Sequence, residues 1–150
     1  QVFIFGHLKK GGSWMGKIHK KILIIEDSDS LVNVITSCFE EFYKDSFVFV
    51  NKNPINSIGE AMKTIDKNHC DIILLDHQLT GNGSEGLEIA QKITGKIKKD
   101  GILVLSTSIL VSTSSELISL YKKNGVLHFP GKNFLEIKEC IDDKCECYAL

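Results

Sequence analysis

Five polar residues that could act together in chemistry each follow a short apolar run of the sequence. They are three carboxylates, a hydroxyl and an ammonium group: Glu26, Asp27, Asp76, Ser106 and Lys132. If the apolar runs are parallel strands, their carboxyl ends meet at one edge of a sheet, where ligands collect. Two carboxylates about 5 Å apart repel by roughly 3 kcal/mol at an effective dielectric near 20, so this cluster needs a cation. Magnesium suits such a site because it prefers oxygen ligands and retains several waters.

The apolar runs themselves predict five strands. Residues 22–25 and 72–75 are continuous apolar stretches of isoleucine and leucine, which is typical of strands covered on both faces. Three further short runs lie at 47–50, 102–105 and 126–129. The polar residues named above therefore stand at or beyond the ends of the first, third, fourth and fifth strands.

Apolar residues at three- and four-residue spacing predict a helix after each strand. The predicted helices lie within 31–42, 53–65, 87–97, 113–123 and 133–141. Asn53 is expected to cap the second helix, with Pro54 at its first position. Thr113 and Glu116 form a capping box for the fourth helix. Asn133 is expected to cap the last.

Alternating strands and helices predict an α/β fold, a doubly wound five-stranded parallel sheet with helices on both faces. The 150 residues fit one domain, which we place at residues 21–142. Residues 1–20 carry several glycines without apolar periodicity and are interpreted as a tail or linker. Residues 143–150 are interpreted as a C-terminal tail.

Composition excludes several classes of protein. The chain is 43% hydrophobic and 25% charged, as ordinary globular domains are. Its 18 basic residues are all lysine and nearly balance 19 acidic ones, so no guanidinium is available to read guanine, and we expect no nucleic-acid partner. No apolar stretch approaches about 18 residues, so we expect no membrane association and a cytoplasmic location. Five cysteines without a Cys-x-x-Cys pair argue against a disulfide framework or zinc site.

The ordered set of polar residues resembles the receiver domain of two-component response regulators, from about Lys20 to Ile141. The resemblance implies the flavodoxin-like strand order 2-1-3-4-5. It also implies that Asp76 is the phosphoacceptor and that magnesium is held by Glu26, Asp27, Asp76 and the backbone carbonyl of Gln78.

The same resemblance extends to the last third of the chain. Gly125, Phe129 and Lys132 follow the spacing of the family's glycine, aromatic and lysine positions. It implies that Lys132 binds the phosphoryl group, that Ser106 is a switch hydroxyl and that Phe129 is an aromatic switch.

The function implied is a phospho-accepting signalling domain and not an enzyme with an external product, since it catalyses only its own phosphotransfer and dephosphorylation. A histidine kinase or phosphotransfer protein would supply the phosphate. A homodimer is possible through the face of the fourth helix, fifth strand and fifth helix. The alternative is a degenerate receiver-like module that acts only by docking or dimerisation, without phosphotransfer.

Two enzyme readings receive less support. Gly81, Gly83 and Gly86 match a dinucleotide fingerprint, but they follow the third strand instead of the first. A phosphatase of the haloacid-dehalogenase type would need an acid two positions after Asp76, where Gln78 stands. His77 has no nucleophile to serve and is expected to be an exposed loop residue.

Overall fold

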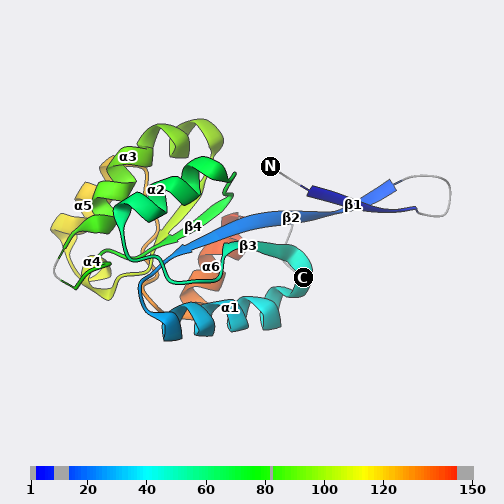
Figure 1. The fold of residues 1–150 in the computed structure, drawn as a ribbon, viewed down its shortest axis with the longest axis horizontal. Coiled ribbons are helices and arrows are strands. Elements are labelled where there is room, and N and C mark those ends of the chain that lie inside the picture. The colour runs from blue at the N-terminus through cyan, green and yellow to red at the C-terminus, as the bar shows by residue number, and fades with distance from the viewer. Residues whose placement is uncertain (1–2, 9–13, 82, 145–150) are drawn as a thin grey trace.

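The computed structural model describes residues 3–8, 14–81 and 83–144, with side chains from residue 19 onward. Its helices and strands are, in chain order, β1 (Phe3–Leu8), β2 (Trp14–Ile25), α1 (Asp29–Tyr43), the 3₁₀ helix η1 (Lys44–Ser46), β3 (Phe47–Asn51), α2 (Ile58–Lys67), β4 (Ile72–Leu75), α3 (Glu85–Asp100), β5 (Leu103–Ser106), α4 (Ile109–Ser112), α5 (Ser115–Lys123) and α6 (Phe134–Lys144). Figure 1 shows them in one view.

The central sheet is parallel, in the order β3-β2-β4-β5. A single parallel bridge between Leu105 and His128 adds the last segment beside β5. The fold class and the strand order predicted from the sequence are therefore confirmed. The predicted fifth strand at 126–129 is wrong as an extended strand, because only His128 pairs. Pro130 lacks a backbone N–H that could extend the pairing, and the next N–H, that of Gly131 with φ 66°, bonds to the Ser106 carbonyl at 3.3 Å.

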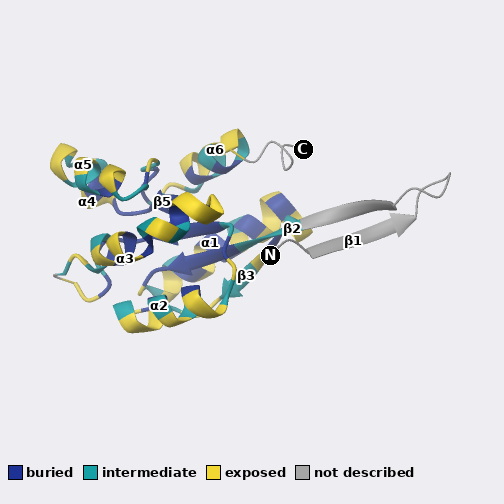
Figure 2. Ribbon diagram, turned by 90° about the horizontal axis from the view of Figure 1, so that it is seen from above, coloured by how far each residue is buried: buried dark blue, intermediate teal, exposed yellow. Residues whose placement is uncertain are grey.

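The sheet divides the interior into two packed layers. Every side chain of Ile22–Ile25 and Ile72–Leu75 is at most 1% exposed, because alternate residues of each strand point to opposite faces. One set packs with residues of α2, α3 and α5, and the other packs with α1 and α6. Figure 2 shows the buried strands between helices whose outer faces are exposed.

Two helices begin later than the sequence predicted. Asn53 and Pro54 precede α2 without starting it; the cap is Ser57, whose hydroxyl accepts from the Glu60 N–H at 3.1 Å. Likewise the cap of α5 is Ser114 and not Thr113, whose hydroxyl instead bonds back to Ile109 in the short helix α4. Ser57 and Glu60 form a capping-box pattern, which is the sequence signal for this start.

The segment before Lys21, which the sequence analysis interprets as a tail or linker, contains a two-stranded ribbon. β1 pairs antiparallel with the first half of β2, from Phe3 opposite His19 to Leu8 opposite Trp14. This two-stranded ribbon extends away from the sheet in Figure 1. No described helix lies beneath it in Figure 1, so its backbone pairing requires no apolar alternation. The short apolar run of Phe3, Ile4 and Phe5 is the local strand signal. The domain boundaries at 21 and 142 stay predictions; α6 itself continues to Lys144.

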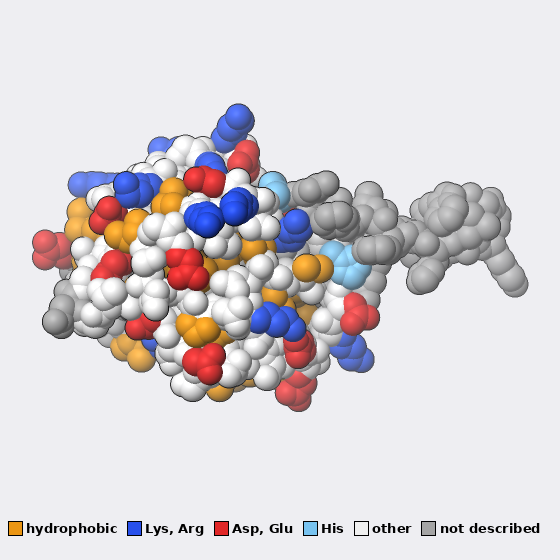
Figure 3. Space-filling model, in the orientation of Figure 1, with side chains coloured by type: hydrophobic (Ala, Val, Ile, Leu, Met, Phe, Trp, Pro, Cys, Tyr) orange, Lys and Arg blue, Asp and Glu red, His pale blue; other side chains and the backbone are white. Residues whose placement is uncertain are grey.

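The surface carries charges of both signs. Figure 3 shows lysine and acidic side chains interspersed over the face in view. Within the described part of the chain, no helix is both long enough and apolar enough to cross a bilayer.

Candidate functional site

The carboxyl ends of β2 and β4 bring three acidic residues together. The two strands pair in register, with Ile25 opposite Leu75, and the Asp76 N–H donates to the Ile25 carbonyl at 3.0 Å. Glu26, Asp27 and Asp76 each place one carboxylate oxygen within 4.8 Å of the others. Glu26 and Asp76 are buried, whereas Asp27 is exposed. The predicted convergence of these three side chains is thus present in the fold.

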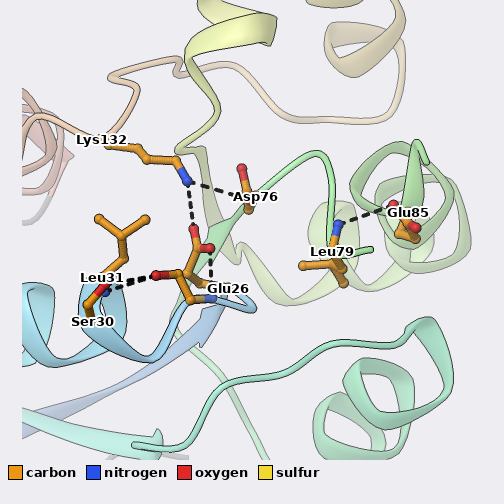
Figure 4. A network of polar contacts seen from close by, with 8 residues as sticks. Glu26, Ser30, Leu31, Asp76, Leu79, Glu85 and Lys132 are labelled. Carbon is orange, nitrogen blue, oxygen red and sulfur yellow. Dashed lines mark hydrogen bonds and ion pairs between the residues drawn. The ribbon is translucent and has the colours of Figure 1, made fainter. Parts of the chain in front are cut away.

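Lys132 supplies a positive charge to this group. Its Nζ lies 3.1 Å from Glu26 Oε2 and 3.7 Å from Asp76 Oδ2, as Figure 4 shows. Burial alone would lower the pKa of the Lys132 ammonium, but its hydrogen bond to Glu26 and the nearby charge of Asp76 raise that pKa overall. One ammonium therefore faces two buried carboxylates and leaves part of their negative charge uncompensated.

The acidity of the two buried carboxyl groups reflects this incomplete balance. Burial raises the pKa of Glu26 to about 7, with further contributions from the charge of Asp76 and the hydrogen bond with Asp27. Burial also raises the pKa of Asp76, although Lys132 and the His77 N–H oppose the rise. A divalent cation would favour the charged forms. The three carboxylates lie close enough together to share one ion, and that of Asp27 is open to water. Such a group of oxygen ligands fits magnesium.

We expect the free energy of unfolding of the metal-free protein to fall as the pH rises from about 4.5 to about 7. A carboxyl group whose pKa is higher in the folded state binds its proton more tightly there, so deprotonation favours unfolding. Glu26 should account for up to roughly 3 kcal/mol of this loss. Denaturant unfolding at about pH 5 and about pH 8 with a chelator checks this, using Glu26→Gln.

The glutamine variant should lose much of the pH dependence, and Glu41→Gln, at an exposed position of α1, should retain it. A parent protein whose pH dependence equals that of Glu26→Gln would contradict the assignment.

Ser106 ends β5 beside this group, opposite Leu75 in the register. Its backbone is fixed on both sides: the N–H donates to His128 at 2.9 Å and the carbonyl accepts from Gly131 at 3.3 Å. Its hydroxyl is the buried side-chain oxygen that lacks a hydrogen-bond partner among the residues described. A buried hydroxyl without a partner lowers the stability of the fold by about 1–3 kcal/mol. A hydrogen-bond acceptor that enters the site could therefore bind this hydroxyl.

The remaining predicted residues lie at the border of the site. Phe129 is half-buried, and its ring meets that of Tyr121 edge-on with centroids 6.5 Å apart. Gln78 is half-buried in the loop two residues beyond Asp76.

His77 is not the exposed loop residue that the sequence suggested. Its side chain is 4% exposed, and Nδ1 lies 2.6 Å from the hydroxyl of Tyr121, which is fully buried. Burial lowers the pKa of the His77 imidazole. The loop turns the side chain toward α5 because the His77 carbonyl accepts from the Gly86 N–H at 2.9 Å.

Glu85 organises the glycine-rich loop in place of a ligand. Its carboxylate accepts from the Leu79 N–H at 3.2 Å, as Figure 4 shows, and also from the Thr80 hydroxyl. A Cβ on Gly83 would lie only 2.2 Å from a Glu85 oxygen. The protein's own carboxylate thus fills the turn in which a dinucleotide fingerprint would bind a phosphate, and this weakens that reading further.

The fold is similar to that of solved receiver domains. The signal receiver domain of a DNA-binding response regulator (merR) from Colwellia psychrerythraea 34H has a TM-score of 0.68 and 21% identity, covering 85% of this chain and 98% of its own. The receiver domain of a signal transduction histidine kinase from Syntrophus aciditrophicus has a TM-score of 0.65 and 17% identity, covering 87% and 92%.

A response regulator from Burkholderia pseudomallei, solved with a phosphorylated aspartic acid, a calcium ion and citrate, has a TM-score of 0.64 and 17% identity, covering 85% of this chain and 71% of its own. No protein-family model matches the sequence, and a search of curated proteins finds no significant match. The likeness thus lies in the fold, and it extends over most of the chain.

Proposed function

We propose that this receiver-like domain accepts a phosphoryl group on Asp76 and acts as a signalling switch. The observation that carries the proposal is the acidic cluster of Glu26, Asp27 and Asp76 at the ends of two central strands, with Lys132 ion-paired to two of them. A histidine kinase or a phosphotransfer protein is the expected donor. The domain catalyses only this transfer and the later hydrolysis of the aspartyl phosphate, which releases inorganic phosphate. We place the domain in the cytoplasm with no nucleic-acid partner.

The transfer uses the side chains as follows. A carboxylate oxygen of Asp76 attacks the phosphorus of the donor, a new O–P bond forms, and the donor's bond to phosphorus breaks. The leaving group, a histidine nitrogen or an acetate oxygen, takes the bonding electron pair. Lys132 stands close enough to Asp76 to neutralise charge on the transferred oxygens. Ser106 supplies a free hydroxyl that can bind one of these oxygens.

Magnesium is the cofactor we propose. Asp27, Asp76 and the backbone carbonyl of Gln78 would hold it directly and Glu26 through water, because magnesium keeps several waters. When bound, the metal neutralises phosphoryl oxygens and aligns the donor. Asp27 is exposed, so its carboxylate is open to an ion that arrives from solvent.

Acetyl phosphate with magnesium should add one acid-labile phosphate per chain, detected by intact-protein mass spectrometry. A chelator should prevent the addition. Loss of a contact to a charged group costs about 1.5–3 kcal/mol. Asp27→Ala should therefore need at least roughly tenfold more magnesium than the parent for half-maximal phosphorylation. Asp29→Ala, which removes an exposed carboxylate two residues later, should behave as the parent.

A folded protein that gains no phosphate under these conditions would contradict the proposal and favour the degenerate docking module. Equal magnesium requirements in the parent and in Asp27→Ala would contradict the metal assignment.

Output is proposed to pass through α5, the segment 126–129 and α6. This surface includes two leucines, Leu127 and Leu135, that are 60% and 62% exposed. In this proposal the two leucines would contact a partner protein or a second copy of the chain.

A further inference from the structure

His77, which directly follows Asp76 in the sequence, forms a buried polar contact with Tyr121 of α5. The ring nitrogen and the hydroxyl are 2.6 Å apart, and the two side chains are 4% and 0% exposed. Either group can donate the proton, depending on the histidine tautomer. A buried hydrogen bond of this kind is costly to break, because it leaves both polar groups without water or another partner.

The contact joins the loop after Asp76 to helix α5. The loop also abuts the first turn of α3, where a Cβ on Gly86 would lie 2.2 Å from the Asp76 carbonyl oxygen and 2.8 Å from the Tyr121 hydroxyl. Only glycine at position 86 lets the Asp76 carbonyl oxygen, the His77 Cα and the Tyr121 hydroxyl lie so close to this backbone. The loop after Asp76, the start of α3 and the Tyr121 hydroxyl therefore meet in close contact at position 86.

Tyr121 continues the contact toward Phe129. Its ring lies 5.7 Å from the His77 ring and 6.5 Å from the Phe129 ring, edge-on to the latter. The His77 side chain, which begins one residue after Asp76, is thus connected through Tyr121 to Phe129 in the proposed output surface. This connection starts at His77, whereas the proposed switch hydroxyl of Ser106 lies on β5.

We propose, on the basis of the proposed phosphoacceptor role of Asp76, that the His77–Tyr121 hydrogen bond is a positioning contact that couples the state of Asp76 to the position of α5. Because His77 is bonded both to Asp76 through the backbone and to Tyr121 through its side chain, a shift of the loop carries α5 with it. By reciprocity, the free energy needed to move α5 opposes ligand binding at Asp76.

The test compares Tyr121→Phe with the parent, using beryllofluoride with magnesium as the probe of the phosphorylated state. Removing the hydroxyl should release α5 from the loop. We expect the NMR shifts of α5 amides on probe binding to fall, while those beside Asp76 persist. Beryllofluoride should bind about fivefold more tightly or beyond, because binding no longer has to move α5.

Tyr43→Phe is the matched control, since Tyr43 is also buried and its hydroxyl bonds to Asp142 at 2.7 Å on the opposite face of the sheet. It should leave both readouts unchanged. His77→Gln retains a group that can bond to the hydroxyl and should retain the α5 response, whereas His77→Leu should lose it. This second pair decides the question if Tyr121→Phe does not fold.

Weaker probe binding together with smaller α5 shifts would indicate general damage to the site and overturn the proposal. Full α5 shifts in both Tyr121→Phe and His77→Leu would also overturn it. If the parent itself does not bind the probe, the proposed phosphoacceptor role fails and this inference fails with it; if the parent binds and responds, only the coupling is in question.

Discussion

Replacing Asp76 by asparagine is expected to abolish phosphate incorporation from acetyl phosphate completely. The amide oxygen is a poor nucleophile, and no other carboxylate directly follows a central strand while also facing Glu26 and Lys132 in the described structure. Intact-protein mass spectrometry with and without acid treatment measures the effect.

The variant should remain folded, which makes a negative result meaningful. Burial raises the pKa of Asp76, so the charged side chain is held at a cost that a neutral amide of the same shape avoids. Asp71→Asn is the matched control, because Asp71 precedes the same strand at its other end and accepts from the Lys21 N–H at 2.8 Å. That variant should gain phosphate like the parent. Phosphate found on Asp76→Asn in the same yield would show that the phosphoacceptor is another residue.

Replacing Ser106 by alanine should preserve phosphorylation but remove much of the response to it. A hydrogen bond to a charged phosphoryl oxygen contributes about 1.5–3 kcal/mol, or roughly tenfold to hundredfold in the ratio of active to inactive forms. A shift from 1:99 to 99:1 needs about 5.5 kcal/mol in all. The NMR shifts around Phe129 on phosphorylation report this ratio.

The unphosphorylated Ser106→Ala protein should be more stable than the parent, by about 1 kcal/mol or more, since the buried hydroxyl has no partner among the described residues. Ser108→Ala, a second buried serine two residues later, controls for loss of a hydroxyl in this segment and should keep the Phe129 shifts. Phosphorylation-induced shifts of parental size in Ser106→Ala would exclude Ser106 as the switch hydroxyl.

The sheet was predictable because its central strands must exclude water on both faces. The runs 22–25 and 72–75 carry no polar residue, which leaves few alternatives to a buried parallel strand. Once the strands are placed, the order of the polar residues at their ends places Glu26, Asp76 and Ser106 at one edge. The main groups of the candidate site could therefore be predicted from the topology of the sheet.

Features that depend on specific distant partners were not predictable in this way. His77 and Tyr121 are 44 residues apart, and nothing local to His77 distinguishes a buried imidazole from an exposed one. The prediction of a full fifth strand was wrong for a related reason. The apolar residues at 126–129 satisfy the strand pattern, but the segment forms only one β-bridge, at His128. The start of α2 was predicted at Asn53, whereas the chain uses Ser57, four residues later, as the cap.

The strands β2 and β4 separate two packed layers, and this separation affects which amino-acid substitutions the chain can accumulate during evolution. The layer of α1 and α6 shares no packed cluster with the layer of α2, α3 and α5, and distant sites without shared partners contribute to stability almost additively. Substitutions around Tyr43 can therefore alter the robustness of the fold while leaving the surroundings of Tyr121 intact. A stabilising substitution in one layer can therefore offset a destabilising substitution that arises in the other layer.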